Sequence, residues 1–257
     1  MPFRLENKVA LITGAGSGIG AETARLFARE GAAVAVADLN REAAQQTVEA
    51  IRAAGGRAEA TSGDVSEAAD AARMVADAIA AFGRIDILFN NAGISCVGAL
   101  HETPIDVWDR VMAVHVRGTY LMCKEALGPM LERGQGVIIN MSSAIAHIGL
   151  AQRAAYAAAK TAILGLTRAM AVDYTPRGIR VLCLCPGTIH TPFVERYLKE
   201  NYPDPEAALA SIKRRQLTGE LGTPADVAHA ALYAASDEAR FLVGAPLIID
   251  GGFTAGK

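Results

Sequence analysis

The chain has 257 residues, with 25 Lys and Arg against 27 Asp and Glu, so its formal net charge is −2. This balance argues against a nucleic-acid-binding protein, because proteins that follow a phosphate backbone carry a basic surplus or a basic stripe. Hydrophobic residues make up 51% of the chain and charged residues 20%, so the chain can bury a large core and is not disordered. The length suits one α/β domain that spans residues 1–257.

In chain order, the residue pattern predicts a strand at 8–12, a helix at 19–30, a strand at 33–37, a helix at 41–54 and a weak strand around 58–60. A helix at 67–82, capped by Ser66 and ended by Gly83, precedes a strand at 85–89 and a helical stretch from Pro104 towards Arg133. A strand at 137–141, a helix at 156–174, a strand at 179–185, a helix after Pro224 and a strand at 247–249 complete the pattern. About seven apolar strands that alternate with helices predict a Rossmann-type, doubly wound parallel sheet with helices on both faces.

Residues 191–223 interrupt this alternation, because they are too polar for a core and too long for a minimal connection. In a doubly wound sheet, ligands bind beyond the carboxyl ends of the strands. We therefore expect residues 191–223 to fold over the ligand as a lid.

No apolar run approaches the ~20 residues that a membrane span needs, and the first residues lack the apolar segment of a signal peptide. We therefore expect a soluble, cytoplasmic chain that acts on no membrane and no nucleic acid. The cysteines agree, because they lie in or beside apolar stretches and form no C-x-x-C pair: Cys96, Cys123, Cys183 and Cys185. Cys183 and Cys185 would share one face of a strand, and we expect free apolar thiols and no metal site.

A dinucleotide site is predicted where the first strand runs through a glycine-rich turn into a helix. Its candidate cofactor contacts are Gly14, Ser17, Gly18, Ile19 and Gly20. Glycines let the backbone approach a pyrophosphate, and the start of the helix supplies free N–H groups.

The residues at the end of the second strand indicate which dinucleotide is bound. Asp38 lies 20 residues beyond Gly18, where a carboxylate can accept both ribose hydroxyls and repel a 2′-phosphate. Leu39 follows Asp38 and Ser17 lies in the loop, so no cation is placed locally to receive that phosphate. The sequence therefore favours NAD over NADP.

Five motifs stand in one order along the chain: Gly14-x-Gly16-x-Gly18-x-Gly20, Asn90-Asn91-Ala92-Gly93, Ser143, Tyr156-x-x-x-Lys160 and Pro186-Gly187-Thr188. Together they resemble the short-chain dehydrogenase/reductase family, and the resemblance runs to Ile249-Asp250-Gly251-Gly252. It implies hydride exchange with NAD and an assembly that is commonly a homotetramer. It also implies further cofactor contacts at Asp64, Val65, Asn91, Ala92, Gly93, Pro186, Gly187, Ile189 and Thr191. The alternative for each of these residues is a role in the local turn alone.

The catalytic candidates are Ser143, Tyr156, Lys160 and His115. Tyr156 and Lys160 are four residues apart on one helix face, so both side chains can reach one ligand. An ammonium about 4 Å away would lower the tyrosine pKa by about three units, which would make Tyr156 a base near neutral pH. The resemblance gives Ser143 a hydrogen bond to the same substrate oxygen, whereas Ser142 is expected to point to the other side of the strand.

His115 departs from the family pattern, which usually has Asn at this place in a water relay from the active-site lysine. An imidazole can also hold a water, and it titrates near neutrality. The alternative is a histidine that is buried in the core with its hydrogen bonds made. The sequence alone does not decide between these two roles of His115.

The substrate candidates are Ser143 and three arginines, Arg153, Arg196 and Arg215, of which Arg153 lies three residues before Tyr156. Arginine holds a carboxylate with paired hydrogen bonds, so these residues favour an anionic substrate. The alternative is a solvated, salt-bridged lid, because acidic residues are interleaved there: Glu195, Glu200, Asp204 and Glu206.

The stretch from Pro186 to Gly219 also resembles a subgroup that acts on small hydroxy or keto acids. Its members include a 2-keto-3-deoxy-L-fuconate 4-dehydrogenase and an enzyme of 4-oxoproline-type cyclic acids. Two other functions compete with this prediction. One is the same chemistry on a neutral or sulfonated sugar, a steroid or a simple alcohol, and the other is a non-catalytic dinucleotide-binding protein.

Overall fold

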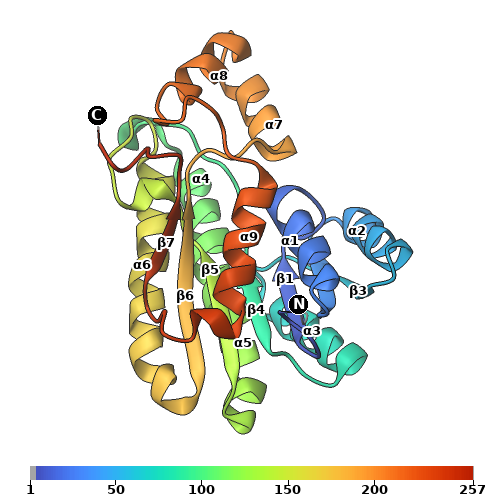
Figure 1. Cartoon of the computed structure of the whole chain (residues 1–257). Helices are drawn as coiled ribbons and strands as arrows, with labels where there is room; N and C mark the ends of the chain where they lie inside the picture. Colours follow the sequence, from blue (N-terminus) through green and yellow to red (C-terminus); the bar gives the residue numbers. More distant parts are fainter. Residues whose placement is uncertain (1–3, 257) are drawn as a thin grey trace.

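One fully parallel sheet of seven strands runs through residues 4–256, which the computed structural model describes (Figure 1). The strand order is β3-β2-β1-β4-β5-β6-β7, so the direction of winding reverses between β1 and β4. The strands are β1 Val9–Thr13, β2 Ala33–Asp38, β3 Arg57–Ser62, β4 Ile87–Asn90, β5 Gly136–Met141, β6 Ile179–Pro186 and β7 Pro246–Ile249. The predicted doubly wound sheet is confirmed, and a reversal of this kind creates a crevice at the carboxyl ends of the strands.

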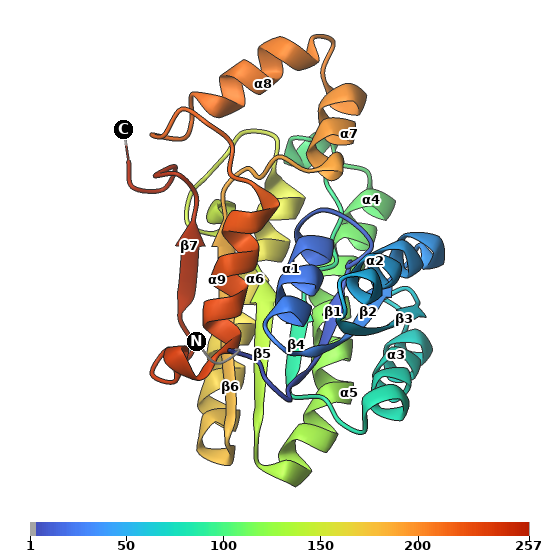
Figure 2. The same cartoon turned by 45° about the vertical axis from the view of Figure 1, so that its right-hand side comes forward.

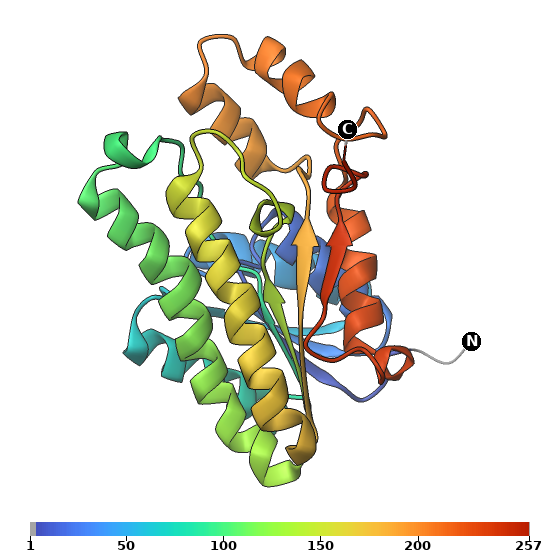
Figure 3. The same ribbon diagram turned by 90° about the vertical axis from the view of Figure 1, so that its left-hand side faces the viewer.

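Helices cover both faces of the sheet, with α1, α2 and α9 on one face and α3, α5 and α6 on the other (Figure 3). Their bounds are α1 Gly18–Arg29, α2 Arg41–Ala53, α3 Ala68–Phe82, α4 Ile105–Met112, α5 Gly118–Arg133, α6 Ala154–Tyr174, α7 Pro192–Asn201, α8 Pro205–Lys213 and α9 Pro224–Ala235. The helical stretch expected from Pro104 to Arg133 is present, but a π-helical turn at Ala113–Arg117 divides it into α4 and α5. Such turns are frequent at functional sites.

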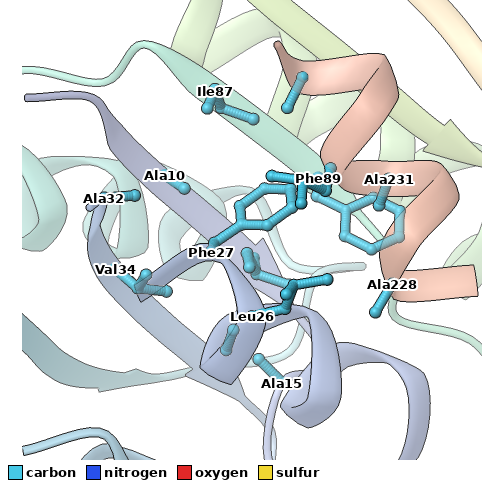
Figure 4. Packing of buried hydrophobic residues seen from close by; sticks show 14 of the residues in the cluster. Ala10, Ala15, Leu26, Phe27, Ala32, Val34, Ile87, Phe89, Ala228 and Ala231 are labelled. Atoms are coloured by element: carbon cyan, nitrogen blue, oxygen red, sulfur yellow. The ribbon is translucent and has the colours of Figure 1, made fainter. Parts of the chain in front are cut away.

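Small residues let the first and the last long helix approach each other over the sheet (Figure 4). Ala228 and Ala231 of α9 face Leu26 and Phe27 of α1, and Phe89 of β4 lies beneath them. Phe27 and Phe89 have no exposed surface. Burying a side chain of this size contributes about 1.5–3 kcal/mol, so this cluster fixes α1 and the glycine turn before it.

Ser66 does not cap α3 as expected. The helix begins at Ala68, after Glu67, which makes no side-chain capping bond. Ser66 instead donates from Oγ to Asp64 Oδ1 at 2.6 Å and accepts from Arg110. Its hydroxyl is therefore already engaged, whereas Gly83 ends α3 in the left-handed region at φ 83°, as predicted.

Residues 191–223, for which we keep the name of the predicted lid, contain two helices, α7 and α8, which lie beyond the carboxyl ends of β5 and β6 (Figure 2). Tyr197, Leu198 and Ile212 form a small apolar cluster of their own within it. Pro192 and Pro205 are the first residues of these helices, where a missing N–H is harmless. The lid therefore has a packed structure separate from the two clusters that cover the sheet.

The cysteines are buried, and none is in a disulfide: Cys96, Cys123, Cys183 and Cys185. The Sγ atoms of Cys183 and Cys185 lie 4.0 Å apart, so the two side chains share a face of β6 as predicted. Residues 4–256 hold no group of His, Cys, Asp or Glu side chains arranged to bind a metal. No helix within the same range is long and apolar enough to cross a membrane.

Candidate active site

One cavity of about 910 Å³ follows the carboxyl ends of the strands from the glycine turn to the lid. Its wall includes all predicted site residues except Gly20. A Cβ on Gly20 would lie 2.2 Å from the Gly14 carbonyl oxygen and 2.6 Å from Asn91 Nδ2. Gly20 therefore allows α1 to pack against the turn and is not part of the cavity wall, so its expected contact with the cofactor stays a prediction.

The glycine turn fits a pyrophosphate. Gly14 has φ +63°, and a Cβ there would lie 2.9 Å from the Ala92 Cα, so a side chain is excluded on two grounds. Ser17 precedes α1 but makes no side-chain capping bond to it. The first N–H groups of α1 are therefore free to bind an anion, and the helix dipole favours negative charge there.

Asp38 is held in place by backbone N–H groups. Its Oδ2 accepts from Gly16 and its Oδ1 from Asn40, each at 2.9 Å. A carboxylate has about four acceptor positions, so two remain for ribose hydroxyls. Arg110 also lines the cavity, but it donates to Asp64 at 2.9 Å and to Ser66 at 3.0 Å.

Ser143, Tyr156 and Lys160 come together between β5 and α6. The Lys160 ammonium donates to the Met141 carbonyl at 2.8 Å and lies 5.5 Å from the centre of the Tyr156 ring. Burial lowers the pKa of Lys160 to about 7. Ser142 donates from Oγ to the Lys160 carbonyl oxygen at 2.8 Å, whereas Ser143 Oγ lies 3.4 Å from the Pro186 carbonyl oxygen, so the two hydroxyls have different partners.

The pKa of Tyr156 departs from the sequence-based expectation. Its ring retains some exposure to the cavity, yet burial raises the pKa of the phenol to about 12. A hydrogen bond with Ser143 and the charge of Arg153 act against this rise. The expected lowering by Lys160 is wrong, because desolvation dominates and the ammonium binds a carbonyl instead.

His115 lies in the π-helical turn and is 2% exposed. Its Nε2 is 2.8 Å from the Ile94 carbonyl oxygen, and its Nδ1 is buried with no hydrogen-bond partner among residues 4–256. The ring stands edge-on to Tyr156, with centroids 5.4 Å apart, and a Cβ on Gly93 would lie 2.5 Å from its Cε1. Burial, assisted by the charge of Lys160, lowers the pKa of His115 to about 3. The expected titration near neutrality is therefore wrong, and the imidazole is neutral at pH 7.

Arg153 lies at the start of α6, directly after Gln152, whose φ is 57°. Its Nη2 donates to the hydroxyls of Tyr197 and Tyr202, and its guanidinium carbon is 5.3 Å from the centre of the Tyr197 ring. Burial lowers the pKa of Arg153, and the charge of Arg215 lowers it further. The sequence pattern does not single out either tyrosine, since aromatic residues in such a segment indicate packing as readily as recognition.

The lid end of the cavity carries uncompensated positive charge. Arg153, Arg196 and Arg215 line it, and none of them forms an ion pair within residues 4–256. The carboxylates of the described cavity wall are Asp38 and Asp64, which belong to the glycine-turn end. The alternative of a salt-bridged lid therefore does not hold for these three arginines.

A family profile described as enoyl-(acyl carrier protein) reductase matches residues 14–254. The 2-(S)-hydroxypropyl-CoM dehydrogenase 3 of Xanthobacter autotrophicus is 41% identical, over 99% of this chain and 100% of its own. The cis-4-hydroxycyclohexanecarboxylate dehydrogenase of Sinomonas cyclohexanicum is 42% identical, over 96% and 97%. The D-threitol dehydrogenase of Mycolicibacterium smegmatis is 40% identical, over 98% and 95%. The crystal structure of a levodione reductase is 33% identical and superposes with a TM-score of 0.96, over 99% of this chain and 100% of the other.

Proposed function

The chain belongs to the short-chain dehydrogenase/reductase family and is an oxidoreductase, and we propose that it acts on a small hydroxy or keto acid with NAD. A deoxy sugar acid such as 2-keto-3-deoxy-L-fuconate, or a cyclic hydroxy acid, has the required groups. The observation that carries this proposal is a group of arginines without an ion-pair partner among residues 4–256, in the same cavity as Ser143 and Tyr156: Arg153, Arg196 and Arg215. Two relatives support it, since their names specify a hydroxypropyl-CoM and a hydroxycyclohexanecarboxylate.

The residues of this chain divide the reaction between them. When bound, the nicotinamide supplies or accepts the hydride. Tyr156, with a pKa of about 12, carries its proton at neutral pH and is ready to donate it to the oxygen of a ketone. Ser143 hydrogen-bonds the same oxygen and fixes its position, while the arginines hold the acid group away from the reacting carbon. Oxidation follows the same path in reverse and starts from the Tyr156 phenolate, which accepts the alcohol proton.

NAD rather than NADP is proposed for the dinucleotide. Asp38 keeps two acceptor positions free for ribose hydroxyls, and its negative charge repels a 2′-phosphate. Arg110 is bound to Asp64 and Ser66, so it offers no free cation to that phosphate.

A neutral polyol is the second candidate substrate, because D-threitol appears in the name of a relative with 40% identity. NADH absorbance, followed across a panel of hydroxy acids, sulfonates and neutral polyols, separates the two. Preference for acids supports the proposal, and preference for polyols refutes it. A chain that binds NADH and turns over no member of a broad panel would be a non-catalytic binding protein.

Substitution of Arg153 tests whether the substrate carries an acid group. Replacing it with Ala removes a charge-assisted contact of about 1.5–3 kcal/mol, so KM for the acid should rise roughly ten- to a hundredfold. The KM of NAD should stay unchanged, because Arg153 lies at the lid end of the cavity. An unchanged KM for every acidic substrate would refute the anionic-substrate proposal.

We also propose that the chain assembles as a homotetramer and works in the cytoplasm. Large apolar side chains such as Phe241, fully exposed, and Val172, 76% exposed, support self-association. The free cysteines suit a reducing compartment. Size-exclusion chromatography with light scattering tests the assembly, and a monomer at micromolar concentration would exclude it.

A further inference from the structure

Arg153 connects the catalytic helix to the lid. It stands at the first turn of α6, and its Nη2 reaches the hydroxyls of Tyr197, within α7, and Tyr202, directly after α7. The two hydroxyls are themselves 2.9 Å apart, and the two rings meet edge to face with centroids 5.7 Å apart. Three side chains therefore close a triangle of hydrogen bonds between the lid and the wall of the cavity.

The chemistry of this triangle leaves the charge of Arg153 intact. A carboxylate in place of the tyrosines would form an ion pair and cancel the positive charge. Phenol hydroxyls accept hydrogen bonds without neutralising the guanidinium, and the face of the Tyr197 ring attracts the cation. Tyr197 is only 9% exposed, so the arrangement is packed and not a surface contact. Arg153 is thus held in one orientation and remains a full cation towards the cavity.

A second cation, Arg215, lines the same cavity as Arg153. Arg215 follows α8 and has no ion-pair partner in the described chain. Its charge disfavours the charged form of Arg153, so the two guanidiniums repel each other. An anion that binds between them removes this repulsion and joins α6 to both ends of the lid.

We propose that Tyr197 and Tyr202 are specificity-determining residues that clamp Arg153 to the lid, so that Arg153 and Arg215 together hold the substrate's anionic group under the closed lid. This inference deepens the proposed function and rests on its assignment of an anionic substrate. Binding the acid and closing the lid then become one event, and a neutral substrate gains less from closure.

The clamp can be tested without substrate. Arg196 and Lys199 are exposed trypsin sites within α7, and we expect cleavage after them to require local opening of this helix. In the double variant Tyr197→Phe, Tyr202→Phe, which keeps both rings, lid cleavage should be roughly tenfold faster or more. The matched control is Tyr120→Phe, a half-exposed tyrosine on α5, whose lid should be cut at the wild-type rate. A double variant cut at the wild-type rate, with an unchanged melting temperature, would overturn the clamp.

The shared anion site is tested with sulfate as the probe, against sodium chloride at equal ionic strength. Sulfate should slow lid cleavage of the wild-type chain roughly threefold or more and should have no effect on Arg215→Gln. No slowing in the wild-type chain, or equal slowing in Arg215→Gln, would overturn the shared site. These readouts do not depend on turnover, so a failure of the proposed reaction leaves them interpretable.

A kinetic experiment then links the clamp to specificity. For an acid that the enzyme turns over, the double tyrosine variant should raise KM roughly five- to tenfold with kcat changed less than about threefold. For a neutral alcohol, KM should hardly move. Equal effects on both substrate classes would show that the tyrosines are structural only.

Discussion

Replacing His115 with Asn should make the protein less sensitive to acid. Burial and the charge of Lys160 lower the pKa of this imidazole from 6.5 to about 3. Below pH 6.5 the unfolded chain takes up a proton that the folded chain refuses, so stability falls as the pH drops towards 3. At pH 5 this linkage costs about 2 kcal/mol relative to pH 7.5, and about 5 kcal/mol when it is fully developed.

The assay compares urea unfolding of the wild-type chain and His115→Asn at pH 7.5 and pH 5, at one protein concentration. Fluorescence of Trp108, the single tryptophan, reports unfolding. The wild-type chain should lose about 2 kcal/mol more than the variant between the two pH values. Carboxylates contribute to acid sensitivity in both proteins and cancel in the comparison. Equal losses would show that His115 is not buried as a neutral base, and the reasoning would be wrong.

Three other predictions address the catalytic and cofactor residues. Tyr156→Phe should abolish nearly all turnover while NADH still binds, because only the proton path is lost; normal activity would move the catalytic assignment elsewhere. Asp38→Ala should raise kcat/KM with NADP relative to NAD by tenfold or more, and an unchanged ratio would contradict the role of its carboxylate. Gly93→Ala should cost about 1–3 kcal/mol in urea unfolding, because its Cβ would lie 2.5 Å from the His115 ring, and adding His115→Asn should restore part of the loss.

Local sequence patterns were sufficient to predict the fold and the positions of the residues around Tyr156. The apolar strands predicted the parallel sheet, and the strand-turn-helix context located the glycine turn that lines the cavity. The spacing of four placed Tyr156 and Lys160 on one side of α6, since helical geometry depends on neighbours in sequence only. Arg153 was expected near Tyr156 because only three positions separate them in the sequence. Each of the two side chains influences the pKa of the other, in agreement with this expectation.

Properties that depend on burial, such as pKa values, could not be predicted from the sequence. The pKa of Tyr156 rises where a fall was predicted, and the pKa of His115 falls far below the expected value near neutrality, because desolvation is set by segments that are distant in sequence. The tyrosines that hold Arg153 lie 44 and 49 residues further along the chain, and no local pattern links residues so far apart. The π-helical turn around His115 likewise arises within a stretch that reads as ordinary helix.

The contact between α1 and α9 determines when this part of the core can form during synthesis. Leu26 and Phe27 emerge early from the ribosome, but the alanines that cover them, Ala228 and Ala231, emerge about two hundred residues later. The apolar face around Phe89 therefore stays open until synthesis is nearly complete, when a contact of high sequence separation closes it. A nascent chain without α9 lacks the alanines that cover this face, so we expect it to expose Leu26 and Phe27 until the last helix is made.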